Sequence, residues 1–118
     1  MVRMRRLVAL VVLVVFVPHA ALAYATDPTT VKRQIRRAWM GDDAKAIRVA
    51  RCESGLNPKA VDPSHTYFGL WQFSVSTWKA YGGPGNDPRA VNAYRQTEVA
   101  WNLFRSRGWA PWPTCGKR

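Results

Sequence analysis

The chain has 118 residues, which is enough for one small domain and excludes a multidomain enzyme or a nucleotide-binding α/β fold. Its 18 Lys and Arg residues outnumber its 7 Asp and Glu residues, giving a formal net charge of +11. Because 47% of the residues are hydrophobic and 21% are charged, the composition is that of a globular protein and not of a disordered or fibrous one.

Residues 1–23 are typical of a secretory signal peptide. Three arginines lie within the first six residues, an unbroken apolar run follows at 7–17, and Ala21 and Ala23 place small residues at alternate positions. The alternative is a retained membrane anchor, but 11 apolar residues are too few for a helix that spans a bilayer, which takes about 20. We expect cleavage after Ala23, with Ala25 as an alternative site, and no membrane anchor afterwards.

Cleavage would leave a 95-residue exported protein with 15 basic and 7 acidic side chains, a net charge of +8. This charge predicts attraction to a polyanion, and for an exported protein the nearest are anionic wall polymers and lipid headgroups, not nucleic acid. The alternative is a merely soluble basic surface. We divide the remainder into a basic helical segment at 24–43 and a folded domain at 44–118, and expect a monomer.

Both cysteines, Cys52 and Cys115, lie in the exported part, where an oxidising compartment favours their pairing. A bridge between them would close 62 intervening residues, for which loop-closure entropy gives a nominal stabilisation of about 4 kcal/mol. Two cysteines and one remaining histidine, His65, are too few for a structural zinc site. We expect one disulfide, no metal ion and no cofactor.

The first predicted helix follows Thr29 or Thr30, either of which is a suitable N-cap. Val31, Ile35 and Trp39 recur at four-residue spacing, so they are expected to form its buried face. The helix should end by the glycine at position 41.

A second helix is predicted over 44–54, capped by Asp42 or Asp43 and ended by Gly55. Glu53 falls in its last turn. A carboxylate there faces the negative end of the helix dipole, which disfavours ionisation.

The residues at 57–67 have loop chemistry, and a short helix should begin near Ser76 and end at Gly82. A long helix is predicted from the N-cap Asp87 to Arg107. Its expected buried residues are Ala90, Tyr94, Thr97, Trp101 and Phe104. The fold class is therefore mainly α, a compact single domain with one disulfide.

Glu53 and Glu98 are the two glutamates of the exported part. Glu98 lies mid-helix among polar residues and is interpreted as part of a solvated face. The segment that follows Glu53 contains aromatic residues, whose desolvation of the carboxyl would raise its pKa and keep a proton available near neutral pH. Such an acid can donate a proton to a leaving-group oxygen.

Two segments around Glu53 resemble a known family. Cys52-Glu53-Ser54-Gly55-Leu56-Asn57-Pro58, followed after a spacer by Gly69-Leu70-Trp71-Gln72-Phe73, is similar to the signature segments of lytic transglycosylases with a goose-lysozyme-like domain. The ending Gly108-Trp109-Ala110-Pro111-Trp112-Pro113-Thr114-Cys115 resembles the resuscitation-promoting factors of actinobacteria. The resemblance covers nearly all of residues 44–115 and implies a lysozyme-like fold.

The resemblance implies a role for several residues. Glu53 would be the single catalytic acid that protonates the bond between N-acetylmuramic acid and N-acetylglucosamine, after which the muramoyl C6 hydroxyl attacks the anomeric carbon. Ser54 would support that carboxylate and Gln72 would line the cleft beside it. Gly69 would let the backbone approach the sugar. Peptidoglycan glycan strands would be the substrate.

Other residues have two interpretations each. Asp62 is either a second carboxylate of the site or the acceptor of an Asx turn before a proline. Trp71 either stacks on a sugar ring or packs in the core. Tyr94, in an Ala-Tyr pair that superficially resembles the family's third segment, is interpreted as core. Because the tail at 109–115 occupies the place of that segment, the anhydro or hydrolysed nature of the product is left open.

The leading functional prediction is a secreted or wall-associated enzyme that cleaves peptidoglycan glycan strands. The first alternatives are a muramidase-type hydrolase and a wall-binding or resuscitation signalling protein that keeps the fold without catalysis. A third class is a cationic effector that acts on anionic membranes, although no long basic amphipathic helix extends beyond 31–39.

Overall fold

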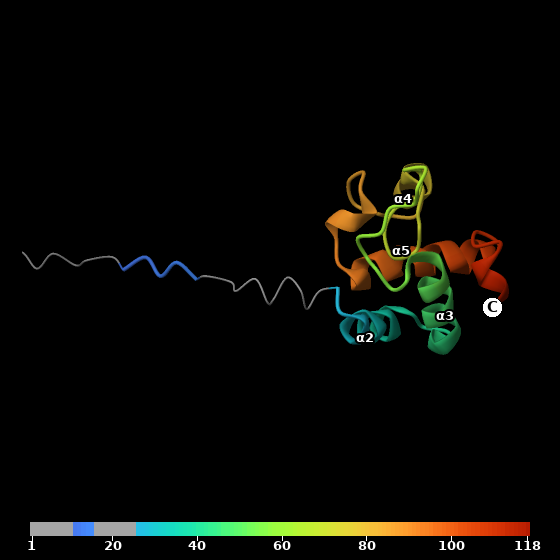
Figure 1. The fold of residues 1–118 in the computed structure, drawn as a ribbon, viewed down its shortest axis with the longest axis horizontal. Coiled ribbons are helices and arrows are strands. Elements are labelled where there is room, and N and C mark those ends of the chain that lie inside the picture. Colours follow the sequence, from blue (N-terminus) through green and yellow to red (C-terminus); the bar gives the residue numbers. More distant parts are fainter. Residues whose placement is uncertain (1–10, 16–25) are drawn as a thin grey trace, which may run out of the picture.

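The computed structural model describes residues 11–15 and 26–118. Its helices, in chain order, are α2 (Pro28–Ala38), α3 (Asp43–Ser54), α4 (Val75–Ala80), the 3-10 helix η1 (Pro88–Ala90), α5 (Ala93–Arg107) and the 3-10 helix η2 (Cys115–Lys117). Helix α5 crosses the middle of the domain, with α2 packed along it and the short α4 on the other side (Figure 1). Extended pairing in the described part is limited to isolated bridges within 61–73. The predicted mainly α fold is confirmed.

The predicted signal peptide lies largely outside the described residues. Of it the structure describes 11–15, which are exposed and form no helix or strand. None of the helices within the described ranges combines the length and the apolar character that a bilayer crossing requires.

Helix α2 begins earlier than predicted. Asp27 is the N-cap, and its carboxylate accepts a hydrogen bond of 3.1 Å from the Thr30 N–H. Pro28 follows at the first helical position, where its fixed φ suits the helix and its missing N–H costs nothing. The Asp-Pro pair therefore outcompetes the threonine cap that we predicted. Helix α3, with Asp42 as N-cap and Gly55 in the left-handed conformation as C-cap, agrees with prediction.

The long helix predicted from Asp87 is interrupted. Asp87 caps only η1, and a second cap, Asn92, accepts a 2.9 Å hydrogen bond from the Arg95 N–H and starts α5. The break is held by the buried Gln96, whose Nε2 donates to the carbonyl of Val91. The Val91 carbonyl therefore accepts a hydrogen bond from a side chain in place of one from a helical N–H.

The buried face of α5 also differs from prediction. Of the five expected residues, Thr97 is buried, Tyr94, Trp101 and Phe104 are half-buried, and Ala90 is exposed and precedes the helix. The fully enclosed face consists of smaller side chains: Ala93, Gln96, Thr97, Val99, Ala100 and Leu103. Small residues allow the neighbouring segments to approach the central helix, while the large rings pack at its margin.

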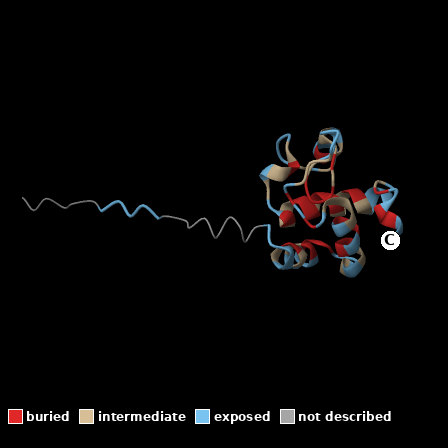
Figure 2. Ribbon diagram, in the orientation of Figure 1, coloured by how far each residue is buried: buried red, intermediate tan, exposed pale blue. Residues whose placement is uncertain are grey.

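Buried residues gather along α5 and on the segments around it (Figure 2). Aromatic side chains dominate this core. Trp39 lies at its centre, stacked on Trp71 and on Trp109 with ring centroids 5.3 Å apart in each pair, and it contacts the edge of Trp101 at 5.0 Å. These offset and edge contacts are the favourable arrangements of aromatic rings. Because Val31 and Trp39 belong to this cluster, the basic segment that contains α2 is packed into the same core as the rest.

Candidate functional site

A pocket of about 670 Å³ lies between the end of α3, the loop before α4 and the tail after α5. Its lining brings together Glu53, Asp62, Trp71 and Gln72 of the predicted site. The remaining lining residues are Tyr67, Phe73, Ser74, Thr77, Leu103, Arg107, Ala110, Pro111, Trp112, Pro113, Thr114 and Cys115. The volume is in the range of pockets that bind small ligands.

Glu53 lies in the last turn of α3, just before the left-handed Gly55 that ends the helix. Its side chain is partly buried, and this burial raises the pKa of the carboxyl above its ordinary value. The cause is desolvation, which disfavours the charged form. The direction agrees with the sequence prediction and suits a group that must hold a proton.

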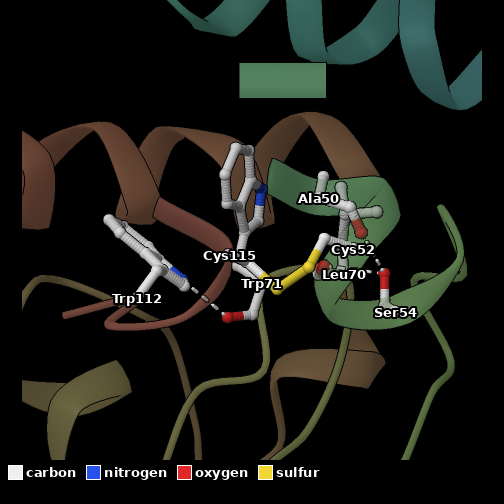
Figure 3. Close-up of a disulfide and its surroundings, with 7 residues drawn as sticks. All are labelled: Ala50, Cys52, Ser54, Leu70, Trp71, Trp112 and Cys115. Atoms are coloured by element: carbon white, nitrogen blue, oxygen red, sulfur yellow. Dashed lines mark hydrogen bonds between the residues drawn. A yellow bond between two sulfur atoms is a disulfide. The ribbon is translucent and has the colours of Figure 1, made fainter. Parts of the chain in front are cut away.

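The predicted disulfide joins Cys52, next to Glu53, to Cys115 in the tail (Figure 3). The same tail is fixed a second time, because the Trp112 indole N–H donates a 3.0 Å hydrogen bond to the carbonyl of Trp71. These two links hold 111–115 against the pocket. The tail, although it contains two prolines and little helix, is thus a fixed wall of the site.

Ser54, which we predicted to bind substrate and to support the Glu53 carboxylate, is not among the residues that line the pocket. Its hydroxyl lies 2.7 Å from the Leu70 carbonyl and 3.0 Å from the Ala50 carbonyl, and the structure gives it no hydrogen bond to Glu53 (Figure 3). A hydroxyl has a single proton, so it donates to these two acceptors in alternation or as a shared bond. Ser54 therefore links the end of α3 to the segment that carries Gln72.

Gly69, which we predicted to approach the sugar, lies against the interior of the protein and is not among the residues that line the pocket. Its φ is +81°, and an added Cβ would overlap the Oε1 atom of the buried Gln96. That oxygen accepts a 2.8 Å hydrogen bond from the Leu70 N–H, while the Gln96 amide donates to the carbonyls of Pro58 and Val91. A glycine is required here because the backbone passes so close to Gln96.

Gln72 lines the pocket as predicted. It adopts a positive φ of +52°, unusual for a residue with a Cβ, and its Nε2 donates a 2.9 Å hydrogen bond to the Gly69 carbonyl. The side-chain amide is therefore anchored at one end of the tight turn at 69–72. Its oxygen has no hydrogen bond within the described residues.

Both interpretations of Asp62 agree with the structure. Its carboxylate accepts hydrogen bonds from the N–H groups of Ser64, Thr66 and Tyr67 and from the Ser64 hydroxyl, as an Asx turn requires. These bonds lower the pKa of Asp62 to about 2, the Ser64 hydroxyl contributing most. Asp62 also lines the pocket with Glu53. The two acids are thus shifted in opposite directions, one toward the protonated form and one toward the ionised form.

We expect Asp62→Asn to change the acid stability of the protein in a defined pH window. The folded-state pKa of Asp62 is depressed to about 2, so its ionised form favours folding above the unfolded pKa near 4. This contribution is lost as the pH falls from about 4 to about 2. The variant should therefore be less stable than wild type at pH 6 and should approach it at pH 2 in urea titrations. A difference that does not vary with pH would contradict the assignment.

Trp71 packs in the core, in agreement with one of its two interpretations. It borders the pocket but is 0% exposed, and its indole N–H donates a 3.1 Å hydrogen bond to the Thr97 hydroxyl. Tyr67 is the aromatic side chain that the sequence analysis missed. It lines the pocket and is 46% exposed, and its backbone N–H is held by Asp62. A tyrosine ring so placed is available for stacking on a sugar.

The remaining predicted residues lie away from the pocket. Glu98 forms an ion pair with Arg95 at 3.1 Å on a partly exposed surface of α5, in agreement with a solvated position. Tyr94 is half-buried beneath the Arg37 guanidinium, and His65 is exposed on the loop. Within the described ranges the His, Cys, Asp and Glu side chains form no group of three that would hold a metal ion.

Residues 40–115 match the model of a family described as "Transglycosylase-like domain". Resuscitation-promoting factor RpfE of Mycobacterium tuberculosis is 43% identical over 72 residues, 59% of this chain and 40% of that protein. Resuscitation-promoting factor RpfC of the same species is 46% identical over 68 residues, 58% and 47% of the two chains. Rpf1 of Corynebacterium glutamicum is 43% identical over 75 residues, 62% and 38%. The aligned region spans less than half of each relative.

Proposed function

The chain belongs to the transglycosylase-like domain family and has its lysozyme-like helical fold, and from this premise we propose that it cleaves peptidoglycan glycan strands with Glu53 as its single catalytic acid. The observation that carries the proposal is the position of Glu53. It is a partly buried carboxyl of raised pKa that lines a pocket of about 670 Å³. The residues that line the pocket lie within the part of the chain that matches the family model.

In the proposed reaction, Glu53 donates its proton to the glycosidic oxygen between N-acetylmuramic acid and N-acetylglucosamine. The bond from that oxygen to the anomeric carbon of the muramoyl sugar breaks, and the glucosamine sugar leaves with a new hydroxyl. The ionised Glu53 then takes the proton of the muramoyl C6 hydroxyl as its oxygen attacks the anomeric carbon. The product is a 1,6-anhydro sugar, and Glu53 is protonated again, so no enzyme nucleophile is needed.

Asp62 favours a second candidate, a hydrolase of the muramidase type. Its pKa is lowered while that of Glu53 in the same pocket is raised, and most glycosidases use a pair of carboxyl groups with different pKa values. In that reaction water replaces the C6 hydroxyl. Against it, the hydrogen bonds from Ser64, Thr66 and Tyr67 occupy both oxygens of Asp62 and reduce its capacity to activate water.

Mass spectrometry of digested sacculi tests both candidates. The anhydro product is lighter than the hydrolysed product by one water. We expect wild-type protein to release fragments with anhydro ends. Fragments with reducing ends would instead support the hydrolase. The absence of any released fragment would overturn both candidates in favour of a wall-binding or signalling protein.

The site of action follows from the proposed substrate, which lies outside the cell membrane. Export by the predicted signal peptide and retention at the wall are part of this proposal. The basic side chains of the domain would favour retention, because anionic wall polymers surround the glycan.

A further inference from the structure

Arg107 is the basic side chain among the residues that line the pocket. It is the last residue of α5 and is exposed. Within residues 26–118 the structure gives its guanidinium no ion pair and no hydrogen bond. A guanidinium offers five N–H donors in a planar fork whose geometry matches a carboxylate. The pocket therefore contains an unused anion-binding group.

The two acids of the pocket leave the charge of Arg107 free. The carboxylate of Asp62 is occupied by the hydrogen bonds of its own loop. Burial is the cause of the raised pKa of Glu53, without a contribution from a neighbouring cation. Arg107 thus forms no internal pair with either acid, and its positive charge is available to a ligand.

The alternative role of Arg107 is purely structural: a basic residue in the last turn of a helix interacts favourably with the helix dipole. Arg105 lies in the same last turn and provides the comparison. It is exposed and bonds to Asn102 at 3.2 Å, but it does not line the pocket. The two arginines therefore share the dipole effect and differ in access to the pocket.

We propose that Arg107 binds a carboxylate on the lactyl substituent of N-acetylmuramic acid, and thereby selects wall glycan over neutral polymers of N-acetylglucosamine. The inference rests on the proposed function. The sugar rings of the glycan are uncharged, so this substituent carries its negative charge. The carboxylate is the lactyl group itself in a denuded strand and belongs to the stem peptide where one is attached.

Binding measurements in a Glu53→Gln background test the proposal without cleavage. The probes are a tetramer of N-acetylglucosamine, a denuded tetrasaccharide of alternating N-acetylglucosamine and N-acetylmuramic acid, and the same tetrasaccharide with stem peptides. We expect Arg107→Gln to weaken binding of an anionic probe about fivefold, the effect of one exposed ion pair, and to leave the neutral tetramer unchanged. Arg105→Gln should change none of them, and Arg107→Lys should retain part of the affinity.

Equal weakening of neutral and anionic probes, or no weakening by Arg107→Gln, would overturn the proposal, as would a failure of all three saccharides to bind. An effect confined to the denuded probe identifies the lactyl carboxylate, and one confined to the stem-bearing probe identifies the peptide. Wild-type affinity for the anionic probes should also fall as ionic strength rises. Because these are binding data, they are independent of whether Glu53 proves essential for cleavage.

Discussion

Glu53→Gln should reduce the release of fragments from sacculi by at least about 10²-fold, because it removes the proton donor while preserving size and shape. The same substitution should not destabilise the fold. Burial raises the pKa of Glu53, so ionising it in the folded protein opposes folding at neutral pH. Removing that carboxyl should therefore leave the free energy of unfolding unchanged or increased.

The effect of Glu53→Gln on the stability of the fold should depend on pH. The folded-state pKa of Glu53 is raised above the unfolded value, so the unfavourable contribution is absent below the unfolded pKa near 4 and complete above the raised pKa. The variant should match wild type in Tm at pH 4 and equal or exceed it at pH 7. Wild-type cleavage should decline as pH rises through the raised pKa.

Glu98→Gln is the matched control, since Glu98 is the other glutamate of the described residues and forms a surface ion pair with Arg95. It should retain full cleavage and change stability by less than about 1 kcal/mol. Normal fragment release by Glu53→Gln would remove Glu53 from the mechanism, whatever the outcome for Glu98.

Loss of the Cys52–Cys115 bridge should have the largest effect on stability. The bridge closes a sequence separation of 63 residues, and removing a native disulfide from a small secreted domain typically costs about 2–5 kcal/mol. For a domain of this size each kcal/mol corresponds to about 4–8 °C in Tm. Thermal unfolding of the Cys52→Ala, Cys115→Ala double variant, compared with oxidised wild type, measures this loss.

The same variant tests whether the bridge positions the acid. Without it, 111–115 is held by the Trp112 indole bond to the Trp71 carbonyl and by packing. The wall beside Glu53 should loosen, and water should reach the carboxyl. We expect the pKa of Glu53, followed by NMR at a temperature where the variant is folded, to move down toward its ordinary value. A folded variant with unchanged cleavage and an unchanged Glu53 titration would limit the bridge to a stabilising role.

Local signals predicted some elements of the fold and missed others for identifiable reasons. Helix α3 was predictable because Asp42 and Gly55, which cap its two ends, flank twelve residues of helix-forming sequence. The start of α5 was not, because Asp87 and Asn92 are both good caps and the choice between them depends on Gln96. Gln96 forms hydrogen bonds with Pro58 and Leu70, which lie 38 and 26 residues before it in the chain. No local sequence pattern indicates contacts of this kind.

The site was predictable to the extent that it depends on residue chemistry. Glu53 was identified from its place at a helix end and its surrounding motif, and Asp62 from its turn. The direction in which an aromatic side chain points depends on tertiary packing, so the sequence left two interpretations of Trp71 open and did not indicate Tyr67. For the same reason the sequence did not indicate that the close neighbour of Gly69 is Gln96.

The pocket is assembled from parts of the chain that extend over some sixty residues, with the acid at one end and residues 110–115 at the other. While a polypeptide is threaded through a translocation channel in an extended state, these parts cannot meet. Oxidation of the thiols, which the cytoplasm opposes, comes later still. Under the proposed export, the pocket and the proposed cleavage activity would therefore form only on the outer side of the membrane, where the proposed substrate lies.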